Sequence, residues 1–550
     1  MKLKSVKILG DNFRSLQANK LYEFNVNHQR EDRLSTKIFA GLNGSGKSNF
    51  LELFSEIFYF LEVFHLSTVS DEEKRTKAFG FEIEYFLPMV KPSPNGLLDF
   101  ANATDFDLHV RIIKPLGAYP EFSIKKFGKH HFERQDKGTE FLLPTKIIAY
   151  TSGQNELLSN PYYKIKYHYF KTFEDKKKLD EGEELAENHR LFFLDYSTNF
   201  SIFVANVLLS NGQKSEFLKE ALKINNLQSF RITINTDELN KRVIPINATL
   251  AENIQKLKLC STSWVEKKVG KNSLLVIDYL VNSATKEAFL FHFKNAFSLF
   301  KVFYELEIFN LYLVQKKTRD LMLQVHKTYN FSDEMAKPDP SRLVFRIEKV
   351  MVNKTIDEFN NQREIYYKAL SDGEHQFNEI FGMVLMMEQA GCLFLIDEPD
   401  THFNPKWGAK LIKTLNLMAA SSFDSKGNIE KVRTQEIIIT THSPFVISDS
   451  SSEDVYHFVK TNGFVEYSNP TVQMYGASIS VILDEIFEKE ETISEMAKKE
   501  LKEMVENITT LEELRVVVDR LNTDFGDSVE KFDLFSKLRN IKTEIEKKKN

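Results

Sequence analysis

The chain has 550 residues, more than one hydrophobic core usually organises, so two or three structural units are expected. With 42% hydrophobic and 27% charged residues it has the composition of an ordinary globular protein, and its formal net charge of -5 excludes a global positive field that would attract nucleic acid or an anionic membrane. The only two cysteines, Cys260 and Cys392, are far apart in the sequence, which excludes a disulfide framework and a zinc site and is typical of a reducing compartment.

The N-terminal segment 1–6 lacks the apolar run of a signal peptide. The nearest approach to a membrane-spanning run, Phe50 to Phe64, is interrupted by Glu52, Glu56 and Glu62. A cytoplasmic protein without membrane contact is therefore expected.

Short alternating apolar runs between residues 4 and 40 predict strands that lead into Gly41–Ser48, with the sequence GLNGSGKS. This stretch matches G-x-x-x-x-G-K-[ST], the loop whose backbone N–H groups surround the phosphates of ATP or GTP. A strand over 37–40 and a helix from Asn49 give the loop the context that the mechanism requires. Lys47 is predicted to contact the β- and γ-phosphates and Ser48 to bind Mg²⁺. The predicted ATP-binding residues of this phosphate loop are Asn43, Gly44, Gly46, Lys47, Ser48 and Asn49.

A short basic turn, 12–16, lies between the first two predicted strands. Its Arg14 is predicted to reach the nucleotide once the phosphate loop has formed. The alternative is a solvated arginine.

Four runs with strand alternation follow the first helix, at 79–85, 106–110, 121–124 and 146–150. They predict an antiparallel sheet that is half exposed to water. The glycine turn 151–156 follows the last run, and its Gln154 is positioned to offer a carbonyl oxygen to Mg²⁺. The alternative is an ordinary polar loop residue.

Residues 155–340 carry no recognisable chemistry and predict a mainly helical insertion with some strand near 274–277. Lys267, Lys268 and Lys271, and the cluster 125–131, are read as ordinary surface charge in preference to phosphate contacts.

The segment 370–376 opens a helix with Ser371 and Gly373, whose hydroxyl and free N–H groups can face an anion. The alternative is a plain helix N-cap with a capping glutamate. The apolar run 392–396 then ends in Asp397 and Glu398, which predicts a buried parallel strand that carries two acids to its carboxyl end. We expect Asp397 to hold Mg²⁺ through water and Glu398 to be the general base for the attacking water.

A second apolar strand is predicted at 437–441 and ends at His442, which can sense the γ-phosphate through a hydrogen bond. The alternative is a satisfied polar cap. Residues 478–550 predict a charged helical tail.

These motifs, in this order, resemble those of the ABC-type ATPase head, the class that includes RecF-like proteins and the structural-maintenance-of-chromosomes proteins. The resemblance implies an α/β fold: an ABC-type P-loop ATPase head with an antiparallel β lobe and a mainly helical insertion. It also implies a homodimer or higher oligomer in which Ser371 and Gly373 of one head face the ATP of the other, with Glu398 and His442 catalytic. The expected units are 1–154 and 341–477 as the halves of the head, 155–340 as the insertion, and 478–550 as the tail.

Within that class the chain looks most like the ATPase of Septu anti-phage systems (PtuA), including retron-linked forms. Segments 147–156 and 397–405 carry this resemblance. It implies ATP and Mg²⁺ as cofactors and a partner HNH-type nuclease (PtuB) that the ATPase controls. In retron forms a reverse transcriptase with its RNA–DNA product is a further partner.

The chain departs from many relatives at 403–405, where Phe-Asn-Pro replaces Leu-His-Pro, so Asn404 receives no role. Two other functions stay open. A RecF-like DNA-repair ATPase would bind DNA directly, and a self-contained nuclease would cut without a partner.

Overall fold

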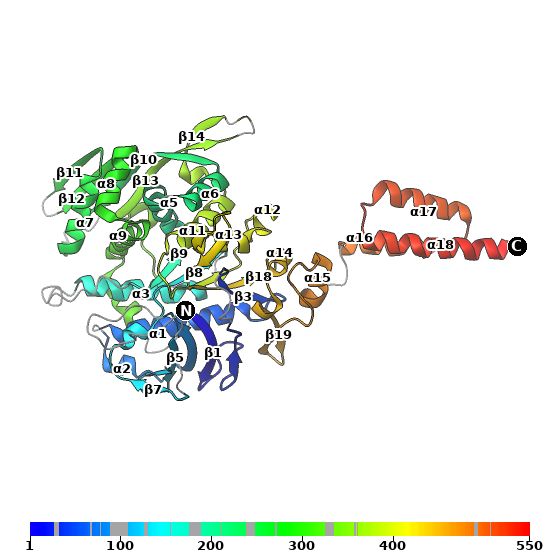
Figure 1. Cartoon of the computed structure of the whole chain (residues 1–550), viewed down its shortest axis with the longest axis horizontal. Helices are drawn as coiled ribbons and strands as arrows, with labels where there is room; N and C mark the ends of the chain where they lie inside the picture. The colour runs from blue at the N-terminus through cyan, green and yellow to red at the C-terminus, as the bar shows by residue number, and fades with distance from the viewer. Residues whose placement is uncertain are drawn as a thin grey trace.

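The computed structural model describes residues 1–26, 32–66, 69–77, 79–88, 108–125, 130–153, 156–174, 189–210, 212–237, 248–269, 272–324, 335–356, 359, 361–488, 493–506 and 508–549. Within these residues the chain is mixed α/β, with several sheets and many helices (Figure 1). The predicted residue Gln154 lies outside the described residues, as do Lys271 and much of the 125–131 cluster.

A seven-stranded sheet in the order β20-β19-β3-β18-β15-β8-β9 holds the predicted motifs. Its strands are β3 (Ser35–Ala40), β8 (Ile147–Thr151), β9 (Leu191–Leu194), β15 (Leu393–Asp397), β18 (Glu436–Thr441), β19 (Val455–Thr461) and β20 (Phe464–Ser468). β15 lies parallel to β18 and to β8, and β18 lies parallel to β3. Every residue of β15 and β18 is buried, so the predicted buried parallel strand over 392–396 is confirmed.

A six-stranded antiparallel sheet in the order β2-β1-β4-β5-β6-β7 forms the N-terminal lobe. Its strands are β1 (Lys2–Leu9), β2 (Leu21–Glu23), β4 (Gly80–Leu87), β5 (Leu108–Lys114), β6 (Glu121–Lys125) and β7 (Glu133–Gln135). The predicted antiparallel sheet is therefore confirmed for β4, β5 and β6. The assignment of 146–150 to it was wrong: β8 joins the parallel sheet, because its first four residues are all buried and do not alternate.

Helix α1 (Lys47–His65) follows the phosphate loop and is buried almost all round. Its three glutamates, which broke the apolar run in the sequence, each meet a cation from another segment. Glu52 pairs with Arg14 at 2.9 Å, Glu56 with a lysine of α3 at 3.7 Å, and Glu62 with Arg190 at 3.0 Å. These pairs neutralise charges that burial would otherwise penalise.

The 155–340 region is mainly helical in its described part. Its helices are α3 (Glu156–Glu174), α5 (Tyr196–Leu209), α6 (Gln213–Leu222), α7 (Ala248–Leu259), α8 (Ser283–Phe293), α9 (Ala296–Ile308) and α10 (Lys316–Gln324). It contains more strand than the sequence predicted, because β10 (Ile224–Asn235), β11 (Ser263–Val269) and β12 (Asn272–Leu280) are antiparallel neighbours.

These strands continue into the next region. With β13 (Phe345–Thr355) and β14 (Gln362–Tyr366) they form a five-stranded sheet in the order β11-β12-β10-β13-β14, which crosses the expected boundary at residue 340. β9 likewise belongs to the central parallel sheet. Long-range strand pairing, which local periodicity does not report, joins this region to the other sheets of the chain.

The C-terminal part begins with α11 (Asp372–Met386). The helices that follow are α12 (Pro405–Gly408), α13 (Leu411–Ala419), α14 (Pro444–Ser448), α15 (Ile479–Phe487), α16 (Glu495–Val505), α17 (Leu511–Asp524) and α18 (Val529–Lys549), with the hairpin β16 (Ala420–Phe423) and β17 (Ile429–Val432) among them. Helices α16 to α18 have a small core of their own and extend away from the body (Figure 1). None of the helices in the described residues has the length and apolarity needed to cross a membrane.

Candidate functional site

The site lies at the carboxyl edge of the seven-stranded sheet, where β3, β8, β15 and β18 end side by side. In the strand register, Asp397 stands opposite Thr440 on one side and Thr151 on the other. The phosphate loop leaves β3 at this edge and enters α1 at Lys47. Open α/β sheets bind ligands at such an edge, because side chains and loops from several strands meet there.

Two glycines shape the phosphate loop by close approach. Gly46 has φ 94°, and a Cβ there would lie 2.3 Å from Cγ2 of Val465 on β20. Gly41 has φ 140°, and its Cβ would lie 2.3 Å from the carbonyl oxygen of Phe458 on β19. Positive φ is accessible to glycine without strain, so the backbone can turn tightly against the sheet.

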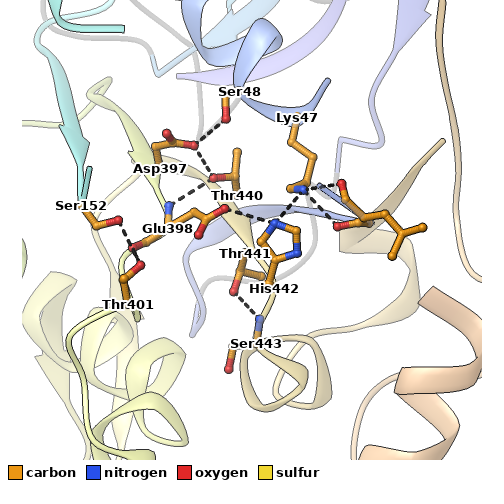
Figure 2. A network of polar contacts seen from close by, with 12 residues as sticks. Lys47, Ser48, Ser152, Asp397, Glu398, Thr401, Thr440, Thr441, His442 and Ser443 are labelled. Carbon is orange, nitrogen blue, oxygen red and sulfur yellow. Dashed lines mark hydrogen bonds and ion pairs between the residues drawn. The ribbon is translucent and has the colours of Figure 1, made fainter. Parts of the chain in front are cut away.

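Lys47 extends from the first turn of α1 towards the same edge (Figure 2). Its Nζ donates to the carbonyl oxygens of Gly41 at 3.0 Å and Leu42 at 3.1 Å, and lies 3.1 Å from Nε2 of His442. Burial lowers the pKa of the Lys47 ammonium to about 8, although the nearby Glu398 and Asp397 act in the opposite direction. The site therefore disfavours the charged form of Lys47, and a bound anion would stabilise that form.

Ser48 and Asp397, both expected to bind Mg²⁺, lie in direct contact. The Ser48 hydroxyl donates to Oδ1 of Asp397 at 2.9 Å. Thr440 donates to the same oxygen at 2.6 Å, and Thr151 donates to Oδ2 at 3.2 Å. Hydroxyl and carboxylate oxygens are the donor set that Mg²⁺ prefers, so these residues fit the cation.

Glu398 follows Asp397 in a left-handed conformation, with φ 51°. Its backbone N–H donates to the carbonyl oxygen and to Oγ1 of Thr440, both at 3.1 Å. These bonds hold a strained turn that directs the Glu398 carboxylate toward His442, whose Nε2 lies 3.2 Å from Oε1 (Figure 2). The hydrogen bond from His442 lowers the pKa of Glu398, partly opposed by burial, and so favours the ionised base.

His442 stands between an acid and a base. Its Nε2 lies near both the Glu398 carboxylate and the Lys47 ammonium. One nitrogen can donate to Glu398 or accept from Lys47, but it does not do both in one tautomer. The position of the imidazole proton therefore decides which partner His442 supports.

Ser371 and Gly373 make their contacts away from this group. Ser371 is the N-cap of α11 and forms a capping box with Glu374, which itself pairs with Lys354. A Cβ on Gly373 would lie 2.6 Å from the carbonyl oxygen of His402, so only glycine fits there without a shift. In the single chain both residues have a structural reason to be present, and a role toward ATP stays a prediction.

Two of the other predicted ATP contacts, Arg14 and Asn49, have partners within the chain. Arg14 has φ 55° and is held by Glu52 through its Nε at 3.2 Å and Nη2 at 2.9 Å. Asn49 donates to Oγ of Ser15 at 2.6 Å, and Asn43 is exposed at the tip of the loop. The Arg14 turn thus packs on α1, next to the phosphate loop.

The structure adds threonines that the sequence analysis did not select. Thr440 supports both acids, because it donates to Asp397 and accepts from Glu398. Thr441 accepts from the backbone N–H of Ser443 at 2.9 Å and so fixes the turn after His442. The only local signal for Thr440 and Thr441 in the sequence is that they are polar residues at the end of the apolar strand before His442.

Residues 273–448 match the family described as "AAA domain, putative AbiEii toxin, Type IV TA system". The matched segment contains Ser371, Asp397, Glu398 and His442, whereas the phosphate loop lies before it. The match supports an ATPase of the ABC/SMC-like class and a nucleotide-binding function. No curated protein matches the chain.

Proposed function

We propose that this chain binds and hydrolyses ATP with Mg²⁺ at the edge formed by β3, β15 and β18. The observation that carries the proposal is the meeting of Lys47, Ser48, Asp397, Glu398 and His442, which come from three separate parts of the chain. A phosphate-binding lysine, an oxygen donor set and a base oriented by histidine are the groups that phosphoryl transfer to water requires.

In this mechanism the phosphate loop and Lys47 bind the β- and γ-phosphates. When bound, Mg²⁺ would supply positive charge that neutralises the phosphate oxygens, and Ser48 and Asp397 would hold it. Glu398 accepts a proton from the attacking water, and His442 orients its carboxylate through the 3.2 Å contact. The resulting charge on the transferred group is stabilised by the Lys47 ammonium.

The working unit in this proposal is a homodimer or higher oligomer. Ser371 and Gly373 would face the ATP bound by the partner head, so that ATP joins the heads and hydrolysis separates them. Ser371 is exposed at the start of α11, where the helix dipole favours an anion. The order of the motifs in the sequence supports this arrangement.

The biological role we propose is control of a partner HNH-type nuclease in anti-phage defence, with nucleotide state setting the geometry of the ATPase heads. Segments 147–156 and 397–405, which resemble Septu ATPases, support this role. The matched family description also includes a toxin of a Type IV TA system, which is compatible with a defence function. In a retron-linked form the complex would include a reverse transcriptase and its RNA–DNA product.

The test begins with the purified chain and the variants Lys47→Ala and Glu398→Gln, with the exposed Lys499→Ala as a matched control. Lys47→Ala is expected to lose nucleotide binding, whereas Glu398→Gln should bind ATP, lose hydrolysis and accumulate as a dimer. Nucleotide occupancy and sedimentation with ATP and Mg²⁺ report these outcomes. Normal hydrolysis by Glu398→Gln would overturn the assignment of the base.

The partner is tested by purifying the tagged chain after expression with its neighbouring genes. Recovery of a small HNH nuclease in a stable complex would support the partner. Loss of that complex when ATP is omitted, or in Lys47→Ala, would support nucleotide-dependent control. Recovery of the ATPase alone, with salt-sensitive DNA binding, would favour the DNA-repair function instead.

A further inference from the structure

A cavity lies between α3, α5 and the strand β13, away from the carboxyl edge of the seven-stranded sheet. Its volume is about 830 Å³, which falls in the range of about 300–1,000 Å³ that is usual for small-molecule sites. None of the residues that line it belongs to the group in Figure 2. Its position, on the side of the five-stranded sheet, makes it a separate site.

The floor of the cavity is a closed polar network. Lys166 pairs with Glu307 at 3.0 Å, and Ser197 donates to the same carboxylate at 2.8 Å. Tyr163 donates to Asp195 at 2.9 Å. Because its polar groups are hydrogen-bonded to one another, the floor is rigid. Its two carboxylates outnumber its one ammonium, so an anion is favoured at the wall and the rim and not at the floor.

The wall and the rim are cationic and aromatic. Lys349 and Lys368 are exposed, and the residues Tyr196 and Tyr366 are 58% and 48% exposed. Arg346 is half-buried, and its Nε is buried without a hydrogen-bond partner among the described residues. Basic side chains outnumber acidic ones in the lining, with Lys166, Lys337, Arg346, Lys349 and Lys368 against Asp195, Glu307 and Glu348, so the wall and rim favour an anion.

Glu348 is the acid beside these cations, and it is already engaged. It accepts a hydrogen bond from Thr233 of β10 at 2.5 Å. This hydrogen bond leaves the Glu348 charge in place, so the carboxylate offsets part of the positive charge of Arg346, Lys349 and Lys368. The exposed Tyr196 and Tyr366 offer ring faces on which a planar group can stack. Phosphate with an attached base is the chemistry that combines both requirements.

We propose that this cavity binds a nucleotide unit, either free or at the end of a nucleic-acid strand, with its phosphate on Arg346 and Lys349 and its base against Tyr196 or Tyr366. The cavity volume and the spread of cations and rings around the mouth suit one or two such units. This site is distinct from the phosphate loop and does not depend on it.

The walls of the cavity connect to the segment that opens α11. Asn199 of α5 donates to the carbonyl oxygen of His375 at 2.9 Å and to Glu379 at 2.8 Å. Lys354 of β13 pairs with Glu374, the capping residue of Ser371. Occupancy would therefore act on the Ser371 segment, and this regulatory part rests on the proposed function.

The binding experiment uses the full-length Lys47→Ala variant, so that the phosphate loop does not contribute. Radiolabelled AMP, ATP and GTP, and labelled short single-stranded RNA and DNA, are the probes in equilibrium dialysis. Arg346→Gln and Lys349→Asn are added to this background, since asparagine tolerates the φ of 54° at residue 349. Arg363→Gln, an exposed position on β14 outside the cavity lining, is the matched control.

Saturable binding of at least one probe to Lys47→Ala, weakened about tenfold or more by Arg346→Gln or Lys349→Asn but not by Arg363→Gln, would support the site. Preference for mononucleotides or for strands identifies the source. Absence of binding by folded Lys47→Ala, or binding that both cavity variants leave unchanged, would overturn the proposal. Arg346→Gln in an otherwise unchanged chain keeps Lys47, so ATP binding by this variant measures the phosphate loop alone. Failure of the proposed ATP site would appear as loss of ATP binding by this variant.

Discussion

Replacing Lys47 by methionine tests whether the phosphate loop holds its lysine at the expense of stability. Methionine has a similar length and no charge, so it removes the ammonium while it keeps most of the packing. The Lys47 side chain is 5% exposed, and burial lowers its pKa from 10.5 to about 8. A difference of this size corresponds to about 3 kcal/mol of unfavourable interaction with the protonated form.

The sign of the pH dependence follows from proton linkage. Between about pH 8 and 10.5 the unfolded chain binds a proton at Lys47 that the folded chain has lost, so the stability contributed by this site rises with pH. Relative to Lys47→Met, wild type should gain about 2 kcal/mol between about pH 7.5 and about pH 9.5. Below this window the buried ammonium opposes folding by the full amount, about 3 kcal/mol.

Urea unfolding of wild type and Lys47→Met at both pH values, without nucleotide, gives the required difference. Circular dichroism and tryptophan fluorescence should report coincident transitions, which licenses the free-energy comparison. Lys499→Met, at a side chain that is 77% exposed, controls for the loss of one lysine from the unfolded chain. A stability difference between wild type and Lys47→Met that stays constant with pH would refute the view that burial penalises the ammonium.

Three further predictions concern other parts of the site. His442→Ala should lower the hydrolysis rate about 100-fold and move the acid limb of the pH–rate profile upward, since the hydrogen bond that lowers the pKa of Glu398 is lost; an unmoved limb would argue against this coupling. Gly46→Ala should destabilise the chain by about 1–3 kcal/mol or more in urea unfolding, because its Cβ would lie 2.3 Å from a valine of β20, whereas Gly44→Ala, with nothing within 4 Å, carries only backbone strain and should be milder. Ser371→Ala should lose about 1 kcal/mol of stability as a cap and also lose the ATP-dependent dimer in sedimentation; loss of stability alone would contradict the role across the dimer.

The local sequence predicted the parts of this protein whose physics is local. The glycine pattern of 41–48 predicted a tight loop before a helix. The loop turns at Gly46 with a positive φ that glycine adopts without strain, and α1 begins at Lys47. The apolar runs before Asp397 and His442 are buried strands, because residues without alternation are covered on both faces. These apolar runs alone were enough to predict that Asp397, Glu398 and His442 lie at strand ends.

The tertiary structure decided which strands lie side by side and which charges meet. The sequence analysis assigned β8 to the antiparallel lobe, yet its pairing with β15 places the Thr151 hydroxyl against Asp397. The sequence did not identify Thr440 as a site residue, because its contact with Asp397 depends on the pairing of β18 with β15. Pairings across hundreds of residues depend on packing that no local window contains.

The fold also decided how the buried charges are paired. From the sequence alone, Arg14 is a basic residue near a phosphate loop, and Glu52 is a charge that interrupts an apolar helix; the fold joins them at 2.9 Å. The cavity beside β13 also exists only in the folded chain, since its lining comes from α3, α5 and β13 together. Sequence determined the chemistry available at each position, and the fold determined which of these groups act on one another, because burial and distance set the strength of every polar contact.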